Sequence, residues 1–221
     1  MGSLRRLSLY SNLYWGFYPK FSLEGIHFPN LQSLALGNFT FFEDKQLDWI
    51  LSHSSTLEEI YLDDCPIIFD VRMLDYQLSE CPIPASEMQY VLEENGCDGW
   101  RYYYPRRWSD YFASFEAGLP HLRHFATGHS EAWDFEPGMP FEHEKDLVPV
   151  LTEARYIQFN GGLGPSQFIT PSGCYNKEWP VCDDEDREAF KSLLRKIDQQ
   201  VNCGEFTIGN LEVENLVELH Y

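Results

Sequence analysis

Apolar residues recur along the first third of the chain in a short pattern that returns at a nearly constant interval. Residues 4–14, 31–41 and 57–67 each place leucine or isoleucine at the first, fourth and sixth positions, with Asn, Phe or Cys at the ninth. The units begin at Leu4, Leu31 and Leu57, so the two intervals between them are almost equal. This regularity indicates an internal repeat, in which one supersecondary unit is used several times.

The alternation within each unit predicts a short strand with two different faces. In the third unit, Ile60 and Leu62 are expected to point into the core, because successive side chains of a strand alternate between the faces of a sheet. Cys65 is expected to fill the turn after the strand as a small, mostly apolar side chain. Consecutive parallel strands then need a crossover on the opposite surface, which is commonly helical.

The repeat continues in weaker form toward the C-terminus. A fourth unit begins near residue 122, after an apolar helical stripe, and a fifth, degenerate unit begins near residue 154. Residues 68–107 carry several prolines and no clear period, so they are interpreted as an irregular insertion. Residues 184–201 combine an acidic start with an apolar stripe, which predicts a C-terminal capping helix. Residues 1–221 are thus expected to form a single domain.

The pattern L-x-x-L-x-L-x-x-N/C-x-L at this interval is typical of leucine-rich repeats. It predicts an α/β solenoid of about five irregular repeats, with a short curved parallel sheet and with helices and loops on its convex side. The segments FPNLQSLALGNFTFFEDKQLDWILSHSSTLEEIYLDDCPI and RRWSDYFASFEAGLPHLRHFATG resemble the leucine-rich-repeat region of fungal F-box proteins. The resemblance implies a substrate-recognition role, since such repeats hold the protein that an SCF ubiquitin ligase modifies.

In that family an F-box precedes the repeats and docks onto the adaptor subunit of the ligase. The first strand of this chain is expected to begin near Leu4, which leaves no room for an F-box before it. We therefore interpret the chain as a fragment or a truncated gene model. Binding to the SCF adaptor is expected only if an F-box lies upstream.

Charge and composition narrow the classes of partner. The net charge is −19, from 35 acidic and 16 basic residues, which disfavours nucleic acid because affinity for it depends on neutralising phosphates. The same charge disfavours an anionic membrane surface and favours basic partners. The N-terminus has no apolar stretch typical of a secretory signal, so we expect an intracellular protein, cytoplasmic or nuclear. The six cysteines are accordingly expected to be free thiols.

Two groups of residues could indicate a metal site or a catalytic site. Asp63, Asp64 and Cys65 mix hard and soft metal ligands, but the repeat pattern accounts for all three positions. The segment from His121 to His143 is the alternative, because its histidines and carboxylates are zinc ligands that would suit a metal-dependent enzyme. The favoured interpretation is a protein without catalytic residues, metal or cofactor.

The strand positions that point away from the core are expected to line a concave surface that binds a protein. Side chains that combine ring area, charge or hydrogen-bonding capacity are the best candidates for contacts with the partner. The predicted partner-binding residues are Glu59, Tyr61, Asp63, His124, Tyr156 and Gln158.

Overall fold

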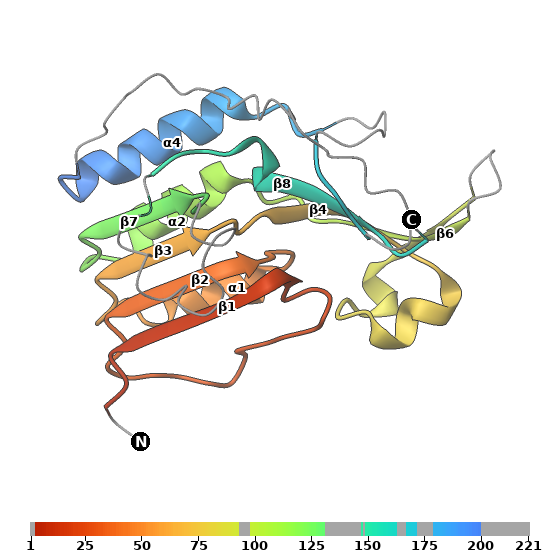
Figure 1. Ribbon diagram of the computed structural model, residues 1–221, viewed down its shortest axis with the longest axis horizontal. Helices are drawn as coiled ribbons and strands as arrows, with labels where there is room; N and C mark the ends of the chain where they lie inside the picture. The colour runs from red at the N-terminus through yellow and green to blue at the C-terminus, as the bar shows by residue number, and fades with distance from the viewer. Residues whose placement is uncertain are drawn as a thin grey trace, which may run out of the picture.

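The fold is a mixed α/β arrangement in which the described strands form two open sheets (Figure 1). The computed structural model describes residues 3–92, 98–130, 147, 149–162, 167–171 and 179–199. Within these ranges the first sheet has four parallel strands in the order β1-β2-β3-β7, with bounds Arg6–Trp15, Ser33–Phe39, Glu59–Asp63 and His124–Gly128. These strands belong to the first four units of the predicted repeat, so their predicted parallel arrangement is confirmed.

The repeat also sets the register between neighbouring strands of this sheet. Ser33 pairs with Arg6 on one side and with Glu59 on the other, and Glu59 pairs in turn with His124. Each of these residues occupies the third place of its unit, so equal places in the repeat lie side by side in the sheet. One face of every strand therefore carries the leucines, isoleucines and phenylalanines of the pattern.

The second sheet, as far as the structure describes it, has five strands in the order β5-β6-β4-β8-β9. Its central pair, β4 and β8, is parallel, whereas β6 pairs with β4 and β9 pairs with β8 in antiparallel fashion. The bounds in chain order are β4 Ile67–Met73, β5 Gln89–Val91, β6 Gly99–Tyr103, β8 Tyr156–Asn160 and β9 Phe168–Ile169. Short 3-10 helices accompany them: η1 Asp75–Glu80, η2 Ala85–Glu87 and η4 Glu153–Arg155.

This second sheet departs from the sequence-based expectation in two ways. The fifth unit does form a strand, β8, but it pairs with β4 and not with β7, so it does not extend the first sheet. The supposed irregular insertion at 68–107 contains most of β4 together with β5 and β6. β4 begins directly after Pro66, and its first residue, Ile67, forms an isolated parallel β-bridge with Phe41. One edge of β4 then pairs with β8.

Helices cover the apolar face of the first sheet, namely α1 Asp44–Leu51, α2 Trp108–Gly118 and α4 Asp183–Lys196. Figure 1 shows α1 and α2 behind the strands and α4 beside α2. The predicted capping helix at 184–201 is thus present, with its end at Lys196. Val201, the last residue expected in it, lies outside the described residues.

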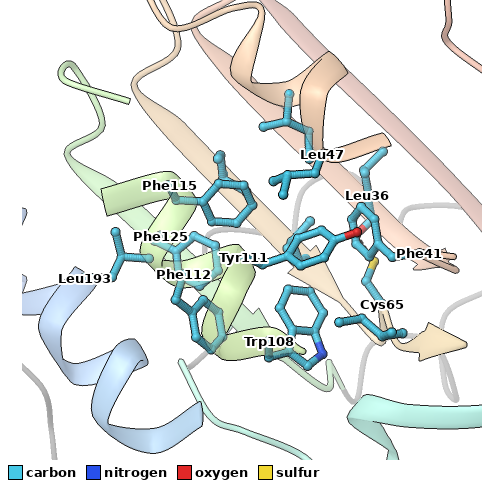
Figure 2. Packing of buried hydrophobic residues seen from close by; sticks show 14 of the residues in the cluster. Leu36, Phe41, Leu47, Cys65, Trp108, Tyr111, Phe112, Phe115, Phe125 and Leu193 are labelled. Carbon is cyan, nitrogen blue, oxygen red and sulfur yellow. Dashed lines mark hydrogen bonds between the residues drawn. The ribbon is translucent and has the colours of Figure 1, made fainter. Parts of the chain in front are cut away.

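The core between helices and sheet is rich in aromatic rings, as Figure 2 shows. Trp108, Tyr111, Phe112 and Phe115 of α2 are at most 1% exposed and point toward the sheet. Their recurrence with the period of a helix places them on one face of α2, as the apolar stripe predicts. Edge-to-face contacts hold the rings together, for example between Phe112 and Phe125 of β7, whose centroids are 5.7 Å apart.

A buried polar network fastens the start of α4 to α2 and β8. Asp186 is fully buried and accepts hydrogen bonds from Arg155 Nε (3.0 Å), from the Tyr156 hydroxyl (2.8 Å) and from the backbone N–H of Ser109 (2.9 Å). The Tyr156 hydroxyl in turn accepts a hydrogen bond from the backbone N–H of Trp108 (2.8 Å). Burial and then the charge of Asp186 raise the pKa of Tyr156, so it stays a neutral donor.

Candidate partner-binding site

The candidate site is the face of the first sheet that points away from α1, α2 and α4. The strand register arranges this face in three rows that cross the sheet. The first row, at the amino ends of β2, β3 and β7, is Arg6, Ser33, Glu59 and His124; the second is Ser8, Ala35, Tyr61 and Ala126; the third is Tyr10, Gly37, Asp63 and Gly128. The alternation predicted for Glu59, Tyr61 and Asp63 is therefore correct.

The middle of this face is closed to solvent. Tyr61 is 4% exposed and packs with Ala35, Ala126 and Leu147. Asp63 is 2% exposed, and its Oδ1 accepts a hydrogen bond from the backbone N–H of Ser130 at 2.8 Å. Tyr61 and Asp63 thus lie on the expected face but are buried, because Leu147 and the residues after β7 pack against them.

Three residues of the first row remain at least partly accessible, whereas the fourth, Ser33, is buried. Arg6 is exposed, and Glu59 and His124 are half-buried. The His124 ring lies against Tyr61, with centroids 5.0 Å apart. Burial lowers the pKa of His124, although Glu59 opposes the shift, so the imidazole is neutral at pH 7. This row presents one cation, one carboxylate and one neutral imidazole.

His124 also has unused hydrogen-bonding capacity. Its Nε2 atom is buried and has no hydrogen-bond partner within the described part of the chain. A buried polar atom without a partner is unfavourable by about 1–3 kcal/mol. A ligand group that formed a hydrogen bond with this atom would remove that cost.

Two of the predicted partner-binding residues lie elsewhere. Tyr156 and Gln158 are in β8 of the second sheet, where they are 3% and 2% exposed. Tyr156 belongs to the core and to the Asp186 network, and Gln158 pairs with Asp70 of β4 and Ile169 of β9. The six predicted residues therefore do not converge, since four share the first sheet and two belong to the second.

The Asp63, Asp64 and Cys65 group has the geometry of a structural turn. The buried Cys65 thiol donates to the backbone oxygens of Leu36 (3.2 Å) and Asp63 (3.3 Å), which links β2 to β3. Asp64 has φ 47°, and Asn38, at the same place in the preceding unit, has φ 56°. Asp and Asn adopt this left-handed conformation more readily than most residues, so both units turn in the same way.

Cys65 is expected to resist alkylation in the folded protein. Burial, as the largest effect, raises the pKa of its thiol well above the usual value, so little thiolate forms at pH 8. Because the folded state holds this proton more tightly than the unfolded state does, stability is expected to fall as pH rises above about 8.5. Iodoacetamide at pH 8 followed by peptide mapping should leave Cys65 unmodified, whereas in urea it should react; rapid labelling of the native protein would contradict the assignment.

One contact that sequence reasoning missed joins adjacent units at the far end of this face. Asp64 Oδ2 lies 2.5 Å from His129 Nδ1. The pairing of Asp63 with Gly128 places the next residues of the two strands side by side, so the repeat alignment contained this signal. His129 is 47% exposed and Asp64 is 21% exposed, which leaves the pair accessible at one side.

The described histidines of the alternative metal site do not converge. His124 begins β7 and His129 follows its end, so about 16 Å of extended chain separates them. His121 is exposed in the loop before the strand. Among the described residues there is no group of three or more His, Cys, Asp or Glu side chains placed to hold a metal ion. His143, at the end of the predicted segment, lies outside the described residues.

Basic and aromatic residues between 100 and 108 are largely engaged within the fold. Arg106 binds Asp44 of α1 (Nε to Oδ1, 3.1 Å), and Arg107 donates to the backbone oxygens of Tyr104 and Arg106. Trp108 is 1% exposed. These contacts give the segment a structural role in joining β6 to α1 and α2.

In the part of the chain that the structure describes, no helix is both long enough and apolar enough to cross a membrane. Comparison of the sequence and structure with protein-family models, curated proteins and solved structures found no match.

Proposed function

We propose that this chain is a protein-interaction module that binds its partner along the accessible row of the first sheet, at Arg6, Glu59 and His124. The observation that carries the proposal is the register, which aligns three side chains of different chemistry across the strands. A row of this kind can complement the charges on a partner's surface, and such complementarity favours specificity and rapid association. The partner expected for a chain of net charge −19 has a basic surface.

The first four units are proposed to form a short leucine-rich-repeat arc. Neighbouring strands derive from successive units, and the helices lie on one side, which supports the interpretation. Partner recognition is also the role implied by the resemblance to the repeats of F-box proteins, where the partner is the protein to be ubiquitinated. We propose the same class of function here, with no catalytic residue of its own.

Reversal of the charge of Glu59 tests the proposal. Glu59→Lys should weaken partner binding about tenfold, because a repulsive contact replaces an attractive one within the row, and the fold should persist since this side chain is half-buried. The measurement is quantitative affinity capture from cell extract, followed by titration of the captured partner with each purified variant. A companion change at Asp63 is avoided, because Asp63 is buried and a lysine there would unfold the sheet.

Asp48→Lys is the matched control, since Asp48 is an exposed carboxylate on α1, on the helical side of the sheet. It makes the same change in net charge away from the proposed face. A partner retained by Asp48→Lys and lost by Glu59→Lys supports the proposal. Equal binding by the wild type and Glu59→Lys would count against this row.

A further inference from the structure

An open hollow of about 450 Å³ lies beside the second sheet, where the parallel strands β4 and β8 both end. Its walls come from segments that are far apart in sequence. Tyr18 follows β1, Tyr76 and Glu80 lie on η1 after β4, and Gln167 precedes β9. Loops at the carboxyl ends of parallel strands are frequent places for ligand binding in α/β proteins.

Two glycines after β8 form part of the lining and fix its shape. A Cβ atom on Gly161 would lie 2.1 Å from Oε1 of Gln77, so a larger residue there would displace the Gln77 side chain. Gln77 is held in place because its Nε2 donates to the Gly161 oxygen (2.8 Å) and its Oε1 accepts from the Leu74 N–H (3.0 Å). Gly162 keeps a second part of the lining free of side-chain atoms.

The side chains that remain available to a ligand are two phenol rings and one carboxylate. The Tyr18 ring is supported by Phe159, with centroids 5.9 Å apart, and is 38% exposed. Tyr76 is 75% exposed, which is high for so large a ring, and within the described part of the chain it makes no hydrogen bond. Glu80 is exposed and has no ion-pair partner among the described residues.

The chemistry of this lining matches a cationic side chain. Phenol rings attract a cation through their negative faces, and a carboxylate beside them adds a charge-assisted hydrogen bond. The described residues that line the hollow include no lysine or arginine, so none of them neutralises Glu80. The net charge of −19 further favours a basic ligand over an acidic one.

We propose that this hollow binds a lysine or arginine side chain of a basic polypeptide, with Tyr18 and Tyr76 contacting the cation and Glu80 pairing with it. This site is on the second sheet and is separate from the row at Arg6, Glu59 and His124. The two sites can therefore be tested independently, and either can fail without the other.

The test is a titration of the ¹⁵N-labelled full chain with the peptide (Lys-Gly)₃, followed by NMR to obtain Kd. The amides of Tyr76 and Glu80 are expected to shift. Tyr76→Leu and Glu80→Gln should each raise Kd about two- to fivefold, as expected for one exposed cation–π contact and one exposed ion pair. Tyr76→Phe keeps the ring and should bind as the wild type does. Both side chains are exposed, so the fold should be retained in each variant.

Matched controls separate this hollow from the general acidity of the chain. Asp48→Asn removes one exposed carboxylate on α1 and should leave Kd unchanged. A peptide with acetylated lysines should not bind, because it lacks the cation. The proposal is overturned if Asp48→Asn and Glu80→Gln weaken binding equally, or if the acetylated peptide binds as well. It is also overturned if a neutral hexasaccharide shifts these amides and the lysine peptide does not.

Discussion

Asp186→Ala is expected to lower the free energy of unfolding by about 3–5 kcal/mol, the range observed when one partner of a buried charge pair is removed. Asp186 is fully buried and accepts hydrogen bonds from Arg155, Tyr156 and the Ser109 backbone, and a longer one from the Cys182 thiol at 3.5 Å. Burial alone would lower the pKa of Arg155, but its hydrogen bonds to Asp186 and Asp183 together raise it above its usual value. The guanidinium therefore keeps its charge and is left without its buried partner in the variant.

Urea denaturation at pH 7 measures this effect. Asp184→Ala is the matched control, because Asp184 lies in the same helical turn with its side chain 93% exposed, and it should change stability by less than about 0.5 kcal/mol. The double variant Asp186→Ala/Arg155→Met should recover part of the loss, since removal of both charges costs less than removal of one. If Asp186→Ala and Asp184→Ala were equally stable, the buried network would not fasten α4.

Phe112→Ala is expected to cost about 3–5 kcal/mol, as is usual for a buried phenylalanine. The Phe112 ring is 0% exposed and contacts rings on three elements. Its centroid lies 5.4 Å from Trp108 on the same helix, 5.7 Å from Phe125 of β7 and 5.1 Å from Phe190 of α4. Truncation therefore leaves a cavity at the place where α2, the sheet and α4 meet.

Thermal unfolding followed by circular dichroism gives the change, and a large loss in Tm is expected. Leu13→Ala provides the comparison, because Leu13 is 77% exposed near the end of β1 and its truncation should alter stability by no more than about 0.5 kcal/mol. A Phe112→Ala protein with the Tm of the wild type would show that the core collapses around the missing ring without loss of packing.

The first sheet could be predicted from the sequence because its order is encoded by a periodic pattern. Leucine or isoleucine at fixed places in the first three units, and Phe125 in the fourth, defines which face is buried, and a strand with one buried face has one favourable register. The stripe from Trp108 to Phe115 predicts α2 for the same reason, since its apolar residues recur with the period of a helix. In each case the signal lies within a single element.

The second sheet could not be predicted in this way. The run IIFDVRM at residues 67–73 has the β-branched and aromatic composition of a strand, but it has no counterpart in the other units and is therefore easily mistaken for part of an insertion. The pairing of β8 with β4 also depends on which strand still has an unpaired edge once the other strands have assembled. At the candidate site, the burial of Tyr61 depends on Leu147, which is far away in sequence. Contacts of this type leave no local pattern.

The pairing of β7 with β3 has a consequence for the order of folding. Glu59 and His124, which pair between β3 and β7, are more than twice as far apart in sequence as Ser33 and Glu59, which pair between β2 and β3. The longer loop adds about 0.8 kcal/mol to the entropic cost of closure. Non-local pairing of this type slows folding, so we expect the first three strands to pair before β7 joins them and the addition of β7 to be the slower step.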